Sequence, residues 1–284
     1  MVVDEGSSPP QSKPVASKEL TTRILSALVM VAVALLTAYW GGWPFALFWL
    51  AAGIAIVVEW TDMTGIEPGR LVQVILGIGL AALTLLFLLD AGLWLSLAVG
   101  LVSLAAAALV VSGAQKRVWA VSSFIYAAPI VLIPPIVRAH PDLGILGLLW
   151  MFAVVWATDI AAYFTGRTFG GPKLCPPISP KKTWSGFIGG VVAATAGGLL
   201  VAWIGQRYGT PLPLSLSGIA ALSIVASIAS QVGDLGESAL KRHCQVKDSS
   251  HLIPGHGGVM DRLDGFWAVC LIVVLVLLTL DPPL

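Results

Sequence analysis

Apolar residues in this chain fall in long, nearly unbroken stretches rather than in the alternating or one-sided patterns of a water-soluble domain. Each stretch approaches the ~20 residues that a helix needs to cross the ~30 Å hydrocarbon core of a bilayer. The pattern predicts an all-α integral membrane protein with about nine transmembrane helices, at about 23–40, 43–60, 71–89, 91–111, 119–137, 143–165, 185–204, 215–238 and 265–280. The third and fourth stretches almost touch at Asp90 and Ala91, so a tight hairpin is expected there.

The remaining segments are short. Residues 1–20 are rich in Ser, Pro and charge and contain no apolar run, which predicts a flexible cytoplasmic tail rather than a signal peptide. We expect N-terminal transmembrane helices over residues 21–140 and a C-terminal transmembrane catalytic region over residues 141–284. Because no stretch outside the membrane is long enough for a separate domain, the chemistry must come from the helices and their loops.

Composition supports a membrane protein and excludes several other classes. The chain is 57% hydrophobic and 11% charged, with a mean hydropathy of +0.90, whereas a soluble domain is roughly 45–50% apolar and about 25% charged. A net charge of +1 offers no overall basic field for nucleic acid, so no nucleic-acid partner is expected. Cys175, Cys244 and Cys270 have no ligand spacing, which argues against a disulfide framework or a structural zinc.

The distribution of Lys and Arg predicts the orientation, because cytoplasmic loops retain positive charge. With the N-terminus inside, the inside segments hold Lys13, Lys18, Arg23, Arg70, Lys116, Arg117, Arg167, Lys173, Lys181, Lys182, Lys241, Arg242, Lys247 and Arg262. The outside segments hold only Arg138 and Arg207. We therefore predict a multi-pass protein of the inner (cytoplasmic) membrane, with its N-terminus inside and its C-terminus outside.

Several carboxylates lie within or beside the predicted helices, where an ionised group costs at least ~2.5–3.5 kcal/mol at the helix centre. They are Glu59, Asp159, Asp234, Glu237, Asp261 and Asp264. The predicted orientation brings all of them to the cytoplasmic rim of the membrane. For Glu59 alone, a position at the water interface is the favoured interpretation. For the other five, we predict a shared polar site that faces the cytoplasm.

The segment from Gly166 to Gly186 is dense in Gly, Pro and basic residues, which predicts a loop that is neither helix nor strand. Such a loop exposes backbone N–H groups beside Arg167, Lys173, Lys181 and Lys182, so it suits an anion. Ser179 or Thr183 can cap the helix that follows, where the helix dipole favours negative charge.

The segment from Gln231 to Asp264 carries the densest set of functional side chains. Asp234, Glu237, Ser238 and Lys241 share one face of a helix, and the pair Gly257–Gly258 permits left-handed or closely packed backbone. Carboxylates from two helices with basic groups between them suit phosphoryl chemistry, because oxygen ligands hold hard divalent cations and Lys or Arg neutralises phosphate oxygens.

At these residues the chain resembles the phosphatidate cytidylyltransferase family, the integral-membrane CDP-diacylglycerol synthases. The family pattern S-x-x-K-R-x4-K-D-x-x-x-x-[LI]-P-x-H-G-G-x-x-D-R-x-D is matched from Ser238 to Asp264. Similar motifs begin at Gln231, Asp159 and Ser179, so the resemblance covers roughly the C-terminal half. Ser185 departs from the family pattern, in which many members have Glu or Gln.

The resemblance implies that CTP and phosphatidic acid react in a lipid bilayer to give CDP-diacylglycerol and pyrophosphate, with Mg²⁺ required and a second cation left open. We expect the catalytic residues to be Asp234, Lys241, Arg242, His256, Asp261, Arg262 and Asp264. The expected substrate-binding residues are Arg167, Ser179, Lys181, Lys182, Thr183, Ser238, Lys247, Asp248, Gly257 and Gly258. The leading metal ligands are Asp234 and Asp261, with Asp159 and Asp264 as weaker candidates.

Two other functions fit parts of the pattern. A CTP-dependent kinase of a polyprenol or phytol-like alcohol would share the metal and the basic loops but would need a base. A secondary ion-coupled transporter would explain intramembrane carboxylates, although these cluster at one rim rather than at midplane. The first four helices are rich in Ala, Gly and Leu, which suits close helix packing or contact within a homodimer equally.

Overall fold

The structure is a computed structural model that describes residues 15–280, with side chains from residue 24 onward. Its helices are α1 (Val15–Trp40), α2 (Gly42–Thr64), α3 (Gly69–Leu88), α4 (Leu93–Val110), α5 (Ala114–Ala139), α6 (Gly144–Phe169), α7 (Trp184–Arg207), α8 (Leu216–His243) and α9 (Met260–Leu280). Two short strands, β1 (Lys173–Cys175) and β2 (Ser179–Thr183), separate α6 from α7. The predicted helical fold is therefore confirmed, with one small β-hairpin added.

Each predicted membrane stretch coincides with one of these helices. From α2 to α9, all eight helices are long and apolar enough to cross a membrane, whereas the apolar part of α1, Ile24–Trp40, is shorter. Helix α1 already begins at Val15, so the predicted tail of residues 1–20 is wrong for residues 15–20, and residues 1–14 lie outside the described part. The predicted hairpin between α3 and α4 is confirmed, and Asp90 adopts a left-handed φ of 52° there.

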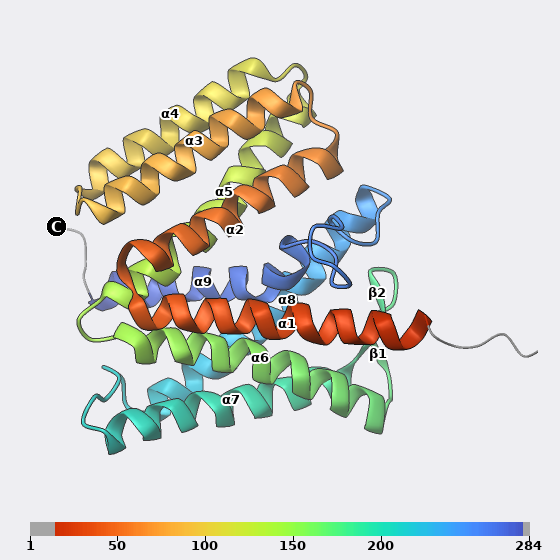
Figure 1. Cartoon of the computed structure of the whole chain (residues 1–284). Coiled ribbons are helices and arrows are strands. Elements are labelled where there is room, and N and C mark those ends of the chain that lie inside the picture. Colours follow the sequence, from red (N-terminus) through yellow and green to blue (C-terminus); the bar gives the residue numbers. More distant parts are fainter. Residues whose placement is uncertain (1–14, 281–284) are drawn as a thin grey trace, which may run out of the picture.

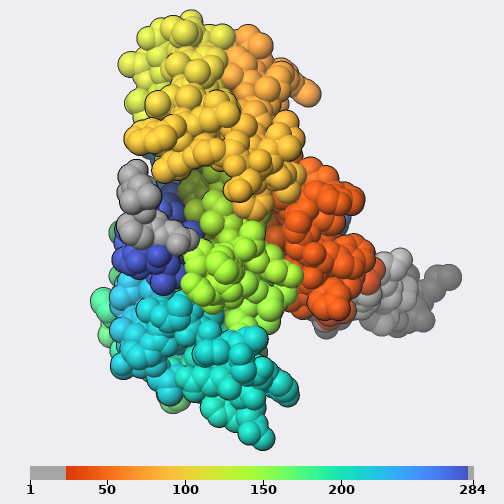
Figure 2. All heavy atoms as spheres, turned by 90° about the vertical axis from the view of Figure 1, so that its left-hand side faces the viewer, coloured from red at the N-terminus to blue at the C-terminus, as the bar shows by residue number. Residues whose placement is uncertain are grey.

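The helices form two groups that α2 and α5 connect (Figure 1). Helices α6 to α9 pack together at one side, while α3 and α4 form an antiparallel pair at the other. Figure 2 shows this pair, in orange and yellow, projecting beyond the rest of the molecule. Half of the residues of α4 are exposed, and only Ser103 and Ala107 are buried. Such an apolar surface suits lipid or a second copy, so the homodimer stays a prediction.

Aromatic side chains join the two groups through α9. Trp49 of α2 stacks on Phe266 of α9 with ring centroids 5.1 Å apart, and Phe152 of α6 lies 5.5 Å from the same ring. Tyr126 of α5 stacks on Trp267 at 4.6 Å. Large offset-stacked rings of this kind bury much apolar surface in a defined geometry. The N-terminal part of α9, which carries the candidate carboxylates Asp261 and Asp264, is thereby held in a fixed position.

Basic side chains bind the ends of several helices. Lys116 Nζ donates to the carbonyl oxygens of Thr64, at 3.3 Å, and of Gly65, at the end of α2. Arg138, one of the two cations that the predicted orientation leaves outside, donates to the carbonyl oxygens of Ala38 at 2.7 Å and Tyr39 at 3.1 Å. Cations are favourable at helix C-termini because of the helix dipole. Arg138 therefore has a structural role that explains its place.

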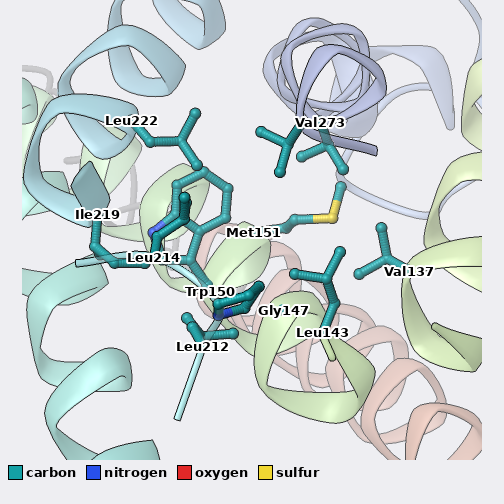
Figure 3. A pocket seen from close by; sticks show the side chains of 12 residues that line it. Val137, Leu143, Gly147, Trp150, Met151, Leu212, Leu214, Ile219, Leu222 and Val273 are labelled. Carbon is teal, nitrogen blue, oxygen red and sulfur yellow. The ribbon is translucent and has the colours of Figure 1, made fainter. Parts of the chain in front are cut away.

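A small apolar pocket lies at the end of the bundle opposite the β-hairpin, as Figure 3 shows. Its lining includes Leu143 and Met151 of α6, Ile219 and Leu222 of α8, and Val273 of α9. The cavity has a volume of about 30 Å³, whereas sites for small molecules measure about 300–1,000 Å³. This pocket is consequently too small for a substrate.

Candidate active site

A much larger open cavity, of about 700 Å³, lies where the β-hairpin meets α6, α7, α8 and α9. Its volume is in the range of small-molecule sites. The cavity is lined by Asp159, Ala162, Tyr163, Gly166, Arg167, Lys173, Leu174, Lys181, Lys182, Thr183, Gly186, Phe187, Gln231, Asp234, Lys241, Asp248, Asp261, Arg262 and Asp264. Carboxylates and basic groups from α6, α8, α9, the hairpin and the segment before α9 therefore share one space.

Most of the predicted site residues line this cavity. The predicted residues that do so are Asp159, Arg167, Lys181, Lys182, Thr183, Asp234, Lys241, Asp248, Asp261, Arg262 and Asp264. The predicted residues that lie outside its lining are Ser179, Ser238, Arg242, Lys247, His256, Gly257 and Gly258. The first group supplies charges to the cavity, while several members of the second group shape the segments around it.

The prediction that the segment from Gly166 to Gly186 forms neither helix nor strand is wrong. Helix α6 continues to Phe169, and β1 and β2 then pair in an antiparallel hairpin, with Lys173 opposite Thr183. Proline has no backbone N–H to donate to a neighbouring strand, so Pro180 argues in the sequence against the strand that the structure shows as β2. A two-stranded hairpin has only edge strands, however, where proline is tolerated. The hairpin holds the basic side chains of the segment against the cavity.

Thr183 joins the hairpin to α7. Its side chain accepts a hydrogen bond from Gly186 N at 3.2 Å and caps the helix, so the predicted cap is confirmed for Thr183 rather than Ser179. Ser185, which departs from the family pattern, donates from its hydroxyl to the carbonyl oxygen of Gly170. This bond closes the base of the hairpin onto the end of α6. The N-terminus of α7 consequently faces the cavity, where its dipole favours anions.

Three carboxylates converge where α8 meets α9. Oxygen atoms of Asp234, Glu237 and Asp264 lie within 4.8 Å of one another. Gly233 permits this approach, because a Cβ at that position would lie 2.8 Å from the carbonyl oxygen of Asp264. Asp234 and Asp264 are among the four predicted ligands, and the other two, Asp159 and Asp261, line the same cavity. The sequence places Glu237 in the shared polar site but does not predict it as a metal ligand.

Lys241 forms the electrostatic centre of the site. Its Nζ lies 2.7 Å from Glu237 Oε2 and 2.6 Å from Asp261 Oδ1. The Glu237 and Asp261 side chains are only 0% and 5% exposed, so neither charge is screened well by water. Lys182 of the hairpin lies 2.6 Å from Asp234 Oδ2. The expected mixture of charges on one face of α8 is thus confirmed and extends to the hairpin.

The second oxygen of Asp261 holds the segment between α8 and α9. Asp261 Oδ2 accepts hydrogen bonds from Ser249 N at 2.9 Å, Ser249 Oγ at 3.0 Å and Gly258 N at 2.8 Å. Gly257 has a left-handed φ of 83°, as the sequence predicts for a glycine pair. Because both oxygens of Asp261 are engaged by protein groups, Asp261 organises this segment, and its role as a metal ligand stays a prediction.

Glu59 belongs to the same network, which makes its expected place at the water interface wrong. It is 3% exposed and accepts hydrogen bonds from two serine hydroxyls and two backbone N–H groups of the segment before α9. Residue spacing along the chain could not join α2 to this segment. The sequence signal that could have indicated this role is a glutamate inside an apolar helix, because a buried carboxylate requires hydrogen-bond donors.

Arg242 and His256 make their hydrogen bonds outside the cavity lining. Arg242 Nη1 donates to the carbonyl oxygen of Val246 at 3.2 Å. His256 Nδ1 lies 2.8 Å from the hydroxyl of Ser26 on α1. The catalytic roles expected for both residues stay predictions, and His256 also links α1 to the segment between α8 and α9.

Besides Lys173 of the hairpin, two polar residues of the lining lie outside the predicted set. Tyr163 accepts a hydrogen bond from Arg167 Nη1 at 2.8 Å and thereby orients that guanidinium. Gln231 Nε2 donates to the carbonyl oxygen of Phe187 at 3.2 Å, which ties α8 to α7. Both residues occur in the motifs that support the family resemblance, but spacing alone gives them no chemical role.

The chain thus combines helices long enough to cross a membrane with one cavity that carries both carboxylates and basic groups, as an integral-membrane protein that binds phosphates would require. A profile of the cytidylyltransferase family matches residues 21–280, and the chain belongs to that family.

Its relatives include a phosphatidate cytidylyltransferase of Brucella suis, 41% identical over 256 residues that cover 90% of this chain and 92% of the relative. A phosphatidate cytidylyltransferase of Haemophilus influenzae is 33% identical, covering 88% of this chain and 95% of its own. A phosphatidate cytidylyltransferase of Bacillus subtilis is 43% identical over 130 residues, or 46% of each chain. The family that the sequence resembles is thereby confirmed.

Proposed function

We propose that this protein transfers CMP from CTP to phosphatidic acid and forms CDP-diacylglycerol and pyrophosphate for phospholipid synthesis. The observation that carries this proposal is a single cavity in which the carboxylates of α8 and α9 face the basic β-hairpin. Relatives named phosphatidate cytidylyltransferase match about nine-tenths of the chain, which supports the same substrates. A cavity at one end of membrane-length helices suits a reaction between a soluble nucleotide and a membrane-held lipid.

In this reaction a phosphate oxygen of phosphatidic acid attacks the α-phosphorus of CTP. A new P–O bond forms to that oxygen, and the bond between the α-phosphorus and the bridging oxygen to the β-phosphate breaks, so that pyrophosphate leaves. The second pKa of a phosphate monoester is about 6, so the nucleophile needs no dedicated base near neutral pH. The work of the protein is then positioning and charge neutralisation.

Individual groups can be assigned parts of that work. Lys241 and Arg262 would hold phosphate oxygens of the two substrates, and both line the cavity. Lys181 and Lys182 would neutralise the leaving pyrophosphate from the hairpin. The N-terminus of α7 behind Thr183 would add the favourable end of a helix dipole.

The carboxylate cluster suits a divalent cation such as Mg²⁺. Asp234, Glu237 and Asp264 offer oxygen ligands within 4.8 Å of one another, the donor type that hard cations require. Glu237 Oε2 lies 2.7 Å from Lys241 Nζ, while Glu237 Oε1 is buried without a hydrogen-bond partner among the described residues. These three residues would hold the ion, with Asp159 and Asp261 as further candidates. A cation bound there would neutralise phosphate oxygens during transfer.

We further propose that the cavity opens toward the cytoplasm. The hairpin and the segment between α8 and α9 lie at one end of the bundle, while the chain leaves α9 at the opposite end (Figure 1). The lysines and arginines of both segments favour the cytoplasmic side.

Cysteine labelling tests this orientation. In a variant with the three native cysteines replaced, single cysteines at Pro177 and Leu252 should react only with a reagent on the cytoplasmic side. A cysteine at Thr210 should react only from outside. All three positions are exposed, so access depends on the membrane alone. Reaction of Leu252→Cys from the outer face would contradict the proposed orientation.

The hairpin lysines should affect nucleotide use. Replacing Lys181 and Lys182 with Gln should raise the apparent KM for CTP at least ~10-fold, because each hydrogen bond to a charged group contributes about 1.5–3 kcal/mol. The KM for phosphatidic acid should change much less. Lys173→Gln, on the opposite strand, is the matched control and should have a smaller effect. Unchanged CTP kinetics in the double variant would leave these lysines with a role in orientation only.

Labelled CTP separates the proposed reaction from its alternatives. Purified protein with phosphatidic acid and Mg²⁺ should transfer label from the α-phosphate of CTP to lipid and release the γ-phosphate in pyrophosphate. A lipid kinase would transfer the γ-phosphate to an alcohol instead. A transporter would move solute across sealed vesicles without forming a new lipid, and either result would contradict the proposal.

A further inference from the structure

Glu59 of α2 makes four hydrogen bonds to a segment about 200 positions later in the chain. Its Oε1 accepts from Ser250 Oγ at 2.7 Å and from Val259 N at 2.8 Å. Its Oε2 accepts from Ser249 Oγ at 3.1 Å and from Met260 N at 2.8 Å. The two backbone donors lie where α9 begins, with Val259 just before the helix and Met260 as its first residue, and N–H groups there have no partner within the helix. One buried carboxylate thus caps α9 and holds the segment before it.

Ser249 connects Glu59 to the candidate active site. Its hydroxyl lies 3.1 Å from Glu59 Oε2 and 3.0 Å from Asp261 Oδ2. Asp261 also accepts from Ser249 N and Gly258 N, and its other oxygen contacts Lys241. The position of the Asp261 carboxylate therefore depends on a segment that Glu59 holds through hydrogen bonds outside the cavity lining.

Gly258 shows how closely these groups are packed. A Cβ at this position would lie 2.7 Å from the Glu59 carboxyl carbon and would overlap the hydroxyl of Ser249. The second glycine of the His-Gly-Gly motif is thus required by the approach of Glu59, rather than by a left-handed φ. The motif and a glutamate from the N-terminal half form one packed unit.

We infer that Glu59 is a positioning residue of the active site, which fixes residues 249–260 and through them Asp261 and Lys241. This inference rests on the proposed function for its effect on catalysis. It also gives the N-terminal half of the chain a part in catalysis, because α2 then holds the wall of the cavity that α8 and α9 form. Glu59 does not line the cavity and would not touch either substrate.

Glu59→Gln is the most informative substitution, because it keeps the volume of the side chain. A glutamine has one acceptor oxygen, and its NH₂ group would face two of the four donors. Amide hydrogen exchange over residues 249–260 should accelerate at least ~10-fold while that of α6 and α7 stays at the wild-type rate. Turnover should fall at least ~30-fold, since a misplacement of ~1 Å at a reacting site can cost ~10²-fold. The KM for CTP should also rise.

The rise in KM is what separates positioning from a loss of folded protein, which would lower the maximal rate alone. Asp62→Asn is the matched control, because Asp62 is an exposed carboxylate less than one turn away on α2 that accepts a hydrogen bond from Gln73 instead. It should behave as wild type. Ser250→Ala removes one of the four donors from the segment itself and should shift exchange and KM in the same direction by less. If Glu59→Gln does not fold, Ser250→Ala tests the inference in its place.

Exchange over residues 249–260 at the wild-type rate in Glu59→Gln and Ser250→Ala would overturn the inference. So would a normal KM for CTP with only a reduced maximal rate. A wild-type protein that forms no CDP-lipid would contradict the proposed function instead, and the exchange measurements would still decide whether Glu59 holds this segment.

Discussion

Replacing Asp234 with Asn should lower the turnover number at least ~10²-fold, the scale seen when a preorganised electrostatic group is removed. The substitution keeps the volume but removes a charge that lies 2.6 Å from Lys182 and within the carboxylate cluster. The substitution should weaken metal binding and should also remove the ion pair that positions Lys182 of the hairpin. Initial rates of CDP-lipid formation with both substrates saturating are the measurement.

Asp142→Asn provides the control, because Asp142 is an exposed carboxylate in the turn between α5 and α6, at the opposite end of the bundle. It should retain wild-type rates and the same yield of inserted protein. Normal turnover in Asp234→Asn, with correct insertion, would show that the cluster of α8 and α9 is structural.

Replacing Lys241 with Met should destabilise the protein by about 3–5 kcal/mol, the cost of breaking a buried ion pair by removing one partner. Lys241 stands between Glu237 and Asp261, whose side chains are almost completely buried. Without the ammonium group, two carboxylates face each other with little water to screen them. Unfolding of the detergent-solubilised protein is the measurement, and activity should be lost as well.

A second substitution should reverse part of this loss. Glu237→Gln in the Lys241→Met background removes one of the two unpaired charges, so the double variant should be more stable than Lys241→Met alone. Activity should not return with stability, because the carboxylate cluster is then incomplete. A Lys241→Met protein as stable as wild type would show that water screens these carboxylates.

The helices could be predicted from the sequence because burial in lipid leaves a simple signal. Every stretch of about 20 apolar residues from Gly42 onward is one helix of the structure. The candidate site followed from the same signal, since Asp234, Asp261 and Asp264 interrupt apolar helices at a cost that only a function or a partner explains.

The contacts between distant segments could not be predicted in this way. The β-hairpin depends on the pairing of Lys173 with Thr183 across a proline-rich turn that contains no strand pattern. The role of Glu59 depends on donors about 200 residues away, and periodicity reports only on neighbours along one helix. Asp261 fits a metal ligand by motif, yet its oxygens are engaged by Lys241, Ser249 and Gly258.

The identity of the lipid product tests the central claim most directly. Wild-type protein and Asp234→Asn should be incubated with CTP, phosphatidic acid and Mg²⁺, and the extracted lipids compared by mass spectrometry. We predict a new lipid in the wild-type reaction whose mass is that of phosphatidic acid joined to CMP with loss of water, with one pyrophosphate released for each molecule formed. The Asp234→Asn reaction should contain almost none of it. A wild-type reaction that leaves phosphatidic acid unchanged, or adds only a phosphate to a lipid, would contradict the account.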